Sequence, residues 1–141
     1  MSEQFAALSD IFARKRDKIL KAWRAMDRNK PGHTTGSALT LSQFLDHIPA
    51  ILDAYELRLR SKAGGTHAKT AEANQKEEGI KHGLHRWQQG YHLTELICEC
   101  GDFQICVFEE LANIGSSHPE LEHRTLLEAH RQLIHLINSI I

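Results

Sequence analysis

The sequence predicts an all-α fold, a four-helix bundle that forms one domain over its 141 residues. Apolar residues recur at the helical spacings of three, four and seven in four segments of the chain. No segment shows the alternation of apolar and polar residues that is typical of a strand. There are only 3 prolines, and the connections between the segments are short or polar. A chain of this length can bury a sufficient core without disulfides.

The first helix is expected over residues 2–28. Its apolar stripe comprises Phe5, Leu8, Phe12, Ile19, Trp23 and Met26. The stretch 29–37 (NKPGHTTGS) contains a proline and two glycines, so we expect a loop there.

A second helix is expected to begin at Thr40, because Thr40 and Gln43 form a capping-box pattern. Its apolar side extends to Leu59. Pro49 lacks an amide donor and clashes with the preceding turn, so this helix is expected to be kinked or broken near His47. Residues 63–76 are small and polar without a stripe, which predicts a mobile linker or a loop that leads into a frayed helix start.

A long third helix is expected from about Gln75 to Asn113. Its apolar arc comprises Leu93, Leu96, Ile97, Cys100, Phe103, Val107 and Leu111. The opposite side carries Gln88, Glu95, Glu99 and Asp102 and is expected to be solvated.

The last helix is expected to start at Ser117, which forms a second capping-box pattern with Glu120. Its end is apolar and has no cap, so we expect it either to continue into a longer protein or to pair with another chain.

The charge balance gives the chain no general affinity for nucleic acids or for anionic membranes, because it has 17 lysine and arginine residues and 18 aspartate and glutamate residues. The sequence lacks a secretory signal and an apolar run of about 20 residues. Three clustered cysteines do not suggest a disulfide framework. We therefore expect a cytoplasmic protein that is not inserted in a membrane.

The candidate site lies where the apolar arc of the third helix becomes polar. One interpretation is that this end of the helix is simply solvated. The other is a polar pocket in which Arg86 pairs with a carboxylate or phosphate group and neighbouring side chains supply hydrogen bonds. In that case Arg86→Ala abolishes the binding of an anionic ligand. The candidate residues are His82, His85, Arg86, Gln89 and Gly90, with Leu45, Ile48 and Pro49 of the second helix facing them.

Two segments resemble the RsbRD-type N-terminal sensor domain family. Residues 41–52 (LSQFLDHIPAIL) are similar to its "qL.dHlP.lL" signature, and residues 82–105 resemble its "H…R…GY.l.ELi.E" helix. The matching positions of the second segment are His82, Arg86, Gly90, Tyr91, Leu93, Glu95, Leu96 and Glu99. The chain departs from the family at Gln104, where arginine is usual, and at Cys100, where an aromatic residue is usual.

The resemblance implies a non-catalytic input domain at the N-terminus of a bacterial signalling protein such as a histidine kinase. It also implies a homodimer that passes its signal through the last helix to a downstream kinase or regulatory domain. It does not name a ligand.

The 10 histidines raise other possibilities. No tight ligand pair of the zinc type is present, and haem has no support beyond histidine in an apolar context, so no cofactor is predicted. A histidine phosphotransfer bundle is the main alternative, although His85-Arg86 lacks the H-x-x-K-G spacing. A metal- or haem-binding helical sensor is a further one. The histidine count also suggests proton sensing. No nucleophile with a paired base is visible, so we expect no enzyme activity.

Overall fold

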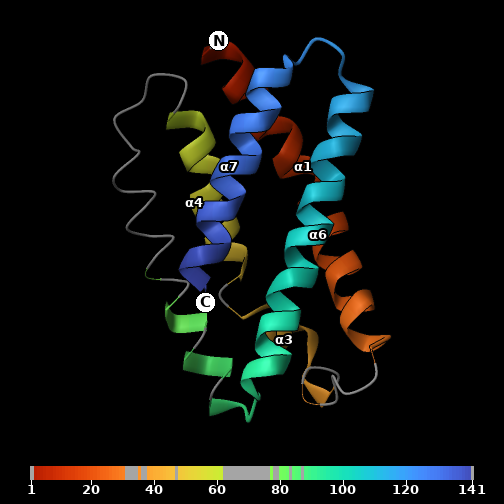
Figure 1. Ribbon diagram of the computed structural model, residues 1–141, viewed down its shortest axis with the longest axis vertical. Coiled ribbons are helices and arrows are strands. Elements are labelled where there is room, and N and C mark those ends of the chain that lie inside the picture. The colour runs from red at the N-terminus through yellow and green to blue at the C-terminus, as the bar shows by residue number, and fades with distance from the viewer. Residues whose placement is uncertain are drawn as a thin grey trace.

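The computed structural model describes residues 2–30, 35, 38–46, 48–61, 77, 80–82, 84–86 and 88–140, with the backbone alone at 2, 139 and 140. Throughout these residues the protein is all-α (Figure 1). The helices are α1 (Ser2–Arg28), α3 (Leu41–Leu45), α4 (Ile48–Ser61), α6 (Leu93–Ser117) and α7 (His123–Ile140). The predicted 63–76 linker and His47 lie outside the described residues. None of the described helices is long and apolar enough to cross a bilayer.

The four longer helices surround one core. Helix α1 packs against α4 and α6, and α7 packs against the same two helices. Figure 1 shows that α1 and α7 run in one direction along the long axis and that α4 and α6 run in the other. The largest core side chains include Phe12, Trp23, Phe44, Tyr55 and Phe103, all almost fully buried. The Tyr55 hydroxyl donates to the carbonyl of Ala129 at 2.7 Å, which ties α4 to α7 inside this core.

The predicted second helix is two helices separated at Asp46. The Thr40 capping box is present, with the Gln43 amide donating to Thr40 Oγ1 at 3.2 Å and the Thr40 amide to Gln43 Oε1 at 2.9 Å. Asp46 ends α3 with a φ of 48° and a ψ of −119°, and its amide donates to the carbonyl of Ser42 at 3.0 Å. Pro49 lies in the first turn of α4, where its missing amide donor costs little.

The long third helix is a wrong prediction. Helix α6 begins at Leu93, and the chain turns at Gly90, which has a φ of 86°. That conformation is strained for a residue with a side chain and accessible to glycine. His82, His85, Arg86 and Gln89 therefore do not continue the face of α6 but belong to a separate segment that precedes it.

We expect Gly90→Ala to lower the free energy of unfolding by about 1–2 kcal/mol, because alanine disfavours a positive φ. Gly101→Ala is the matched control. Gly101 lies inside α6, and an added Cβ would meet nothing within 4 Å, so this change should stabilise the protein by about 0.5–1 kcal/mol. Urea unfolding of the two variants measures both values. Equal effects of the two substitutions would contradict the assigned turn.

The faces of α6 also differ from the prediction. Cys100, Phe103, Val107 and Leu111 are buried as expected, but Leu93 and Ile97 are 66% and 48% exposed. The acidic side chains expected in solvent are instead buried: Glu95, Glu99 and Asp102. Partners from distant segments explain the burial of two of them, since Lys30 Nζ forms an ion pair with Asp102 and Arg86 forms one with Glu99.

Helix α7 starts at His123, not at Ser117, because α6 itself continues through Ser117. The predicted capping box is therefore wrong. A side chain from α1 takes its place: Gln4 Oε1 accepts from the Glu122 amide at 2.7 Å and from Thr125 Oγ1 at 2.8 Å. Gln4 Nε2 also donates to the carbonyl of Glu120 at 2.9 Å. The start of α7 is thus capped by a residue more than a hundred positions away.

Candidate functional site

The turn before α6 directs Arg86 into the protein. Residues 84–86 are helical, and the Gln89 amide donates to the carbonyl of His85 at 2.9 Å. The Tyr91 amide then donates to the carbonyl of Arg86 at 3.1 Å, which closes the turn at Gly90. This reversal places Arg86 and His82 against both α3 and the first turns of α6.

The side chain of Arg86 is completely buried, and its donors point to acceptors within the protein. Nε donates to Glu99 Oε1 at 2.7 Å, and Nη1 donates to the carbonyl of Gln43 and to Gln89 Oε1, both at 3.1 Å. Nη2 donates to the carbonyl of Phe44. One guanidinium group therefore joins the turn before α6, helix α3 and helix α6.

The carboxylate of Glu99 is fully buried between two basic side chains. Besides Arg86, it faces His82, whose Nε2 lies 3.6 Å from Oε1. Burial alone would raise the pKa of Glu99, but the hydrogen bonds and charge from His82 and Arg86 hold it below its ordinary value of 4.5. Glu99 therefore stays ionised, and its stabilising contribution is present above this ordinary value and is lost as the pH falls through the lower pKa of the folded state.

Asp46 is the second carboxylate near His82. Its Oδ1 lies 2.8 Å from Nδ1 of His85, and its Oδ2 lies 3.3 Å from Nδ1 of His82. His82 is almost fully buried, whereas the side chain of His85 is 43% exposed. We call Asp46, His82, His85, Arg86 and Glu99 the ionic cluster; His85 is its most exposed histidine.

Aromatic rings enclose the ionic cluster. The guanidinium of Arg86 lies 4.9 Å from the ring centroid of Tyr91 and 5.2 Å from that of Phe44. The guanidinium of Arg24 also lies over the Phe44 ring, 4.5 Å from its centroid. The ring centroids of Phe44 and Trp23 are 4.4 Å apart. Burial, followed by the Glu99 carboxylate, raises the pKa of Tyr91, so its hydroxyl stays protonated.

The structure brings together four of the predicted site residues, His82, His85, Arg86 and Gln89, with Gly90 in the adjoining turn. The three residues from the second predicted helix have other contacts. Leu45 packs on the core and Ile48 is part of it, while the carbonyl of Pro49 accepts from Arg16 Nη2 at 2.6 Å. The residues that sequence reasoning missed are Asp46 and Glu99. Both stood in the segments that carry the family resemblance.

The arrangement holds separate elements of the protein together. The charges of Arg86 and Glu99 are neutralised by each other at 2.7 Å, away from solvent. In the described part of the chain, no group of three histidine, cysteine, aspartate or glutamate side chains is placed to hold a metal ion. The three cysteines are free. Comparison with known proteins found no matching family, no matching curated protein and no matching solved structure.

A histidine outside the cluster has an altered environment. The ring of His130 on α7 stacks on Phe108 of α6, with 4.2 Å between centroids and 20° between planes. Burial, followed by the charge of the nearby His123, lowers the pKa of His130 below its ordinary value of 6.5. The unfolded chain therefore binds a proton here more readily than the folded protein does.

It follows that His130 makes the folded protein less stable as the pH falls below 6.5 toward the lower folded pKa. We expect His130→Gln to lose less of its free energy of unfolding than the wild type does between about pH 7.5 and about pH 5. Urea unfolding across this range measures the difference. The exposed His135→Gln is the control and should follow the wild type; if both variants do so, His130 is not responsible.

Proposed function

We propose that this chain is a non-catalytic signal-input domain, a four-helix bundle of the RsbRD-type sensor family that acts at the N-terminus of a cytoplasmic bacterial signalling protein such as a histidine kinase. One observation carries the proposal. The two segments that carry the resemblance lie far apart in the sequence, yet their polar residues meet in the ionic cluster: Asp46 comes from the first segment, and His82, Arg86 and Glu99 come from the second.

A buried group of charges suits an input device. Such a group contributes little net stability compared with apolar packing, and its best-attested role is to select one packing over another. Here Arg86 donates to two carbonyls of α3, and Asp46 at the end of α3 is bonded to His85. A signal that favours one arrangement of these contacts shifts the equilibrium between two packings of the bundle.

The relay to the last helix has two routes in the packing. Helix α4 begins two residues after Asp46 and is bonded to α7 through Tyr55 and Ala129. Helix α6 carries Glu99 at one end of the molecule and packs along α7. A change at the ionic cluster therefore reaches α7 through two rigid helices.

The test is hydrogen exchange of the full chain with Asp46→Asn, which removes the charge facing His82 and His85 with little change of shape. If the domain relays changes at the cluster, exchange rises in α7 more than in α1. The exposed Asp17→Asn, which also removes one negative charge, should leave both helices unchanged. An effect confined to residues around Asp46 contradicts the relay. Uptake of a phosphoryl group from a phosphorylated response regulator would instead favour the phosphotransfer alternative.

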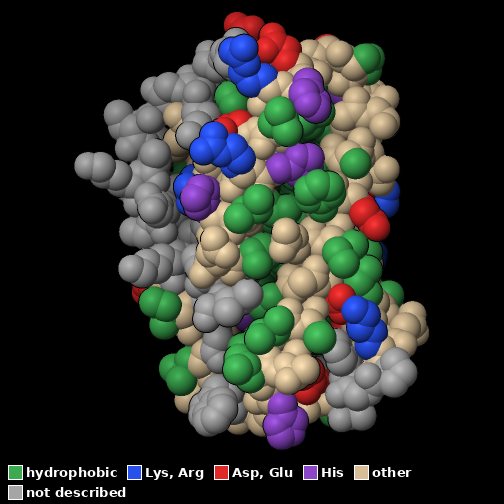
Figure 2. Space-filling view, in the orientation of Figure 1, with side chains coloured by type: hydrophobic (Ala, Val, Ile, Leu, Met, Phe, Trp, Pro, Cys, Tyr) green, Lys and Arg blue, Asp and Glu red, His purple; other side chains and the backbone are tan. Residues whose placement is uncertain are grey.

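A homodimer belongs to the same proposal. Helices α6 and α7 expose large apolar side chains, and Figure 2 shows hydrophobic groups over the middle of this face with few charged ones. A shallow groove of about 430 Å³ lies beside Gly101 on α6. Exposed apolar surface of this kind is typical of a protein interface. The residues concerned are Leu93, Ile97, Ile105, Phe108, Leu127 and Ile134.

Sedimentation analysis measures this dimer. We expect the wild type to dimerise at micromolar concentrations and Ile105→Asp to be monomeric, because a charge in the middle of an apolar contact is left unpaired. Leu41→Asp, at an equally exposed leucine of α3, is the control and should still dimerise. A wild type that remains monomeric at high micromolar concentration contradicts the proposal.

A further inference from the structure

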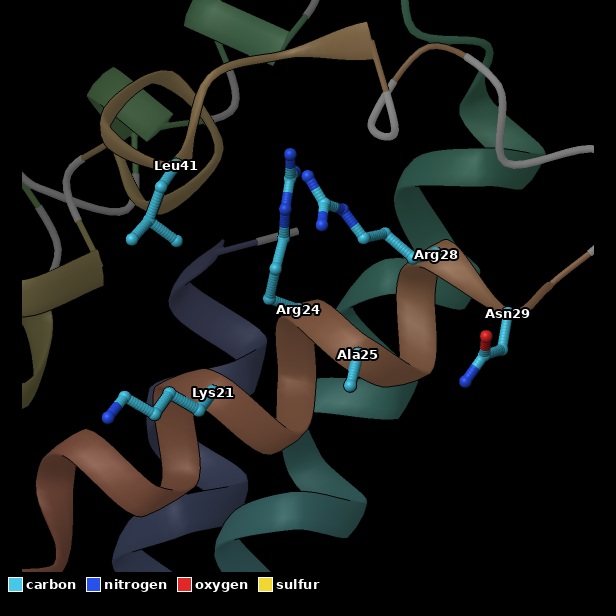
Figure 3. A pocket seen from close by; sticks show the side chains of 6 residues that line it. All are labelled: Lys21, Arg24, Ala25, Arg28, Asn29 and Leu41. Carbon is cyan, nitrogen blue, oxygen red and sulfur yellow. The ribbon is translucent and has the colours of Figure 1, made fainter.

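A second site lies on the outer side of α1, apart from the ionic cluster. An open pocket of about 450 Å³ is formed where the end of α1 meets α3. Figure 3 shows three basic side chains along one side of α1, with Arg24 and Arg28 directing their guanidinium groups toward the same space. The lining residues are Lys21, Arg24, Ala25, Arg28, Asn29 and Leu41.

The pocket concentrates positive charge in a chain whose formal net charge is −1. Lys21, Arg24 and Arg28 supply three cations, and no acidic residue is among the described residues that line the space. The nearest acid on the helix, Asp27, is fully buried and does not line the pocket. The guanidinium groups of Arg24 and Arg28 are directed to the same space, with Lys21 farther along α1, so an anion between the two guanidinium groups would be favoured.

Arg24 is held in place before any ligand arrives. It is buried, its Nη2 donates to the carbonyl of Leu39 at 2.5 Å, and its guanidinium lies over the Phe44 ring. Burial, followed by the charge of Arg28, lowers the pKa of Arg24, and Asp27 opposes this effect. A guanidinium group that is already fixed loses little conformational entropy when a ligand binds. In this respect the pocket differs from a surface of mobile basic side chains.

The geometry points to a binding site in this pocket for a small phosphate monoester. Two guanidinium groups match the oxygens of a phosphate, and three cations suit a group that carries about −1.5 to −2 charges at neutral pH better than a singly charged carboxylate. Leu41 and Ala25 give the pocket an apolar wall for the organic part of the ligand. This inference does not depend on the proposed input function, because binding is measured on the chain itself.

Calorimetry with phenyl phosphate, inorganic phosphate and benzoate tests the site on the full chain. We expect phenyl phosphate to bind saturably with a dissociation constant on the order of 1 mM or below, inorganic phosphate to bind more weakly, and benzoate more weakly again. Arg28→Gln, at an exposed residue whose loss leaves the core intact, should raise the dissociation constant about tenfold. Lys21→Gln should raise it by a smaller factor.

Arg14→Gln is the matched control, because it removes the same charge from an exposed position of α1 outside the pocket. It should change the dissociation constant by less than about twofold. Circular dichroism establishes that each variant is folded. The inference is overturned if phenyl phosphate does not saturate, if Arg14→Gln weakens binding as much as Arg28→Gln does, or if benzoate binds as tightly as phenyl phosphate.

Discussion

Replacing Arg86 with methionine is expected to lower the free energy of unfolding by about 3–5 kcal/mol, since it leaves the buried carboxylate of Glu99 without its closest counter-charge. The carbonyls of Gln43 and Phe44 lose their donor in the same step. Urea unfolding followed by circular dichroism measures the loss. Arg14→Met, at an exposed position of α1, should change stability by no more than about 0.5 kcal/mol.

The double variant Arg86→Met with Glu99→Leu separates the ion pair from the packing. Removing both charges leaves no uncompensated carboxylate, so the double variant should be more stable than Arg86→Met alone. It should not reach the wild type, because the two carbonyls of α3 remain without the donor. A loss below about 1 kcal/mol for Arg86→Met would mean that Arg86 is solvated, as in the interpretation of this segment as a solvated helix end.

Local signals in the sequence predicted the elements that depend on local contacts. The apolar stripe of the first segment predicted the full extent of α1, Ser2–Arg28. The Thr40 capping box predicted the start of α3. Pro49 indicated the break that occurs at Asp46. In each case the interaction that sets the helix boundary lies within a few residues of that boundary, so the local sequence pattern is sufficient to predict it.

The predictions that failed depend on partners distant in the sequence. The side of α6 with Glu99 and Asp102 is buried because Arg86 and Lys30 form ion pairs with these two carboxylates. The spacing of apolar residues along a helix contains no information about such ion pairs. The start of α7 is set by Gln4 from α1. Gly90 was visible in the sequence, but a single glycine within a helical pattern does not reveal its own φ.

The candidate site was half predictable for the same reason. The change from apolar to polar residues along the chain is sufficient to locate His82 and Arg86. It could not identify Asp46 and Glu99 as their partners, because the turn at Gly90 brings these residues together in space rather than along one helix. The three cations of the α1 pocket are spaced along an ordinary amphipathic face, so only the approach of α3 distinguishes them from a solvated surface.

Phe44 connects the two sites, and Phe44→Ala is expected to cost about 3–5 kcal/mol of stability. Its ring is fully buried, packs on Trp23, and lies beneath the guanidinium groups of both Arg24 and Arg86. Removing the ring opens a cavity and withdraws two cation–π contacts. Phe44→Leu retains most of the apolar volume and should cost about 1–2 kcal/mol, measured by urea unfolding.

The exposed Leu84 provides the control for this experiment. Leu84→Ala should cost less than about 1 kcal/mol, because its side chain is 53% exposed and lies outside the proposed dimer face. Phe44→Leu also has a second readout, since Arg24 loses the ring that positions it. We expect this variant to bind phenyl phosphate more weakly while remaining folded. If it binds as tightly as the wild type, the Phe44 ring does not position Arg24 for the pocket, and the two sites are independent.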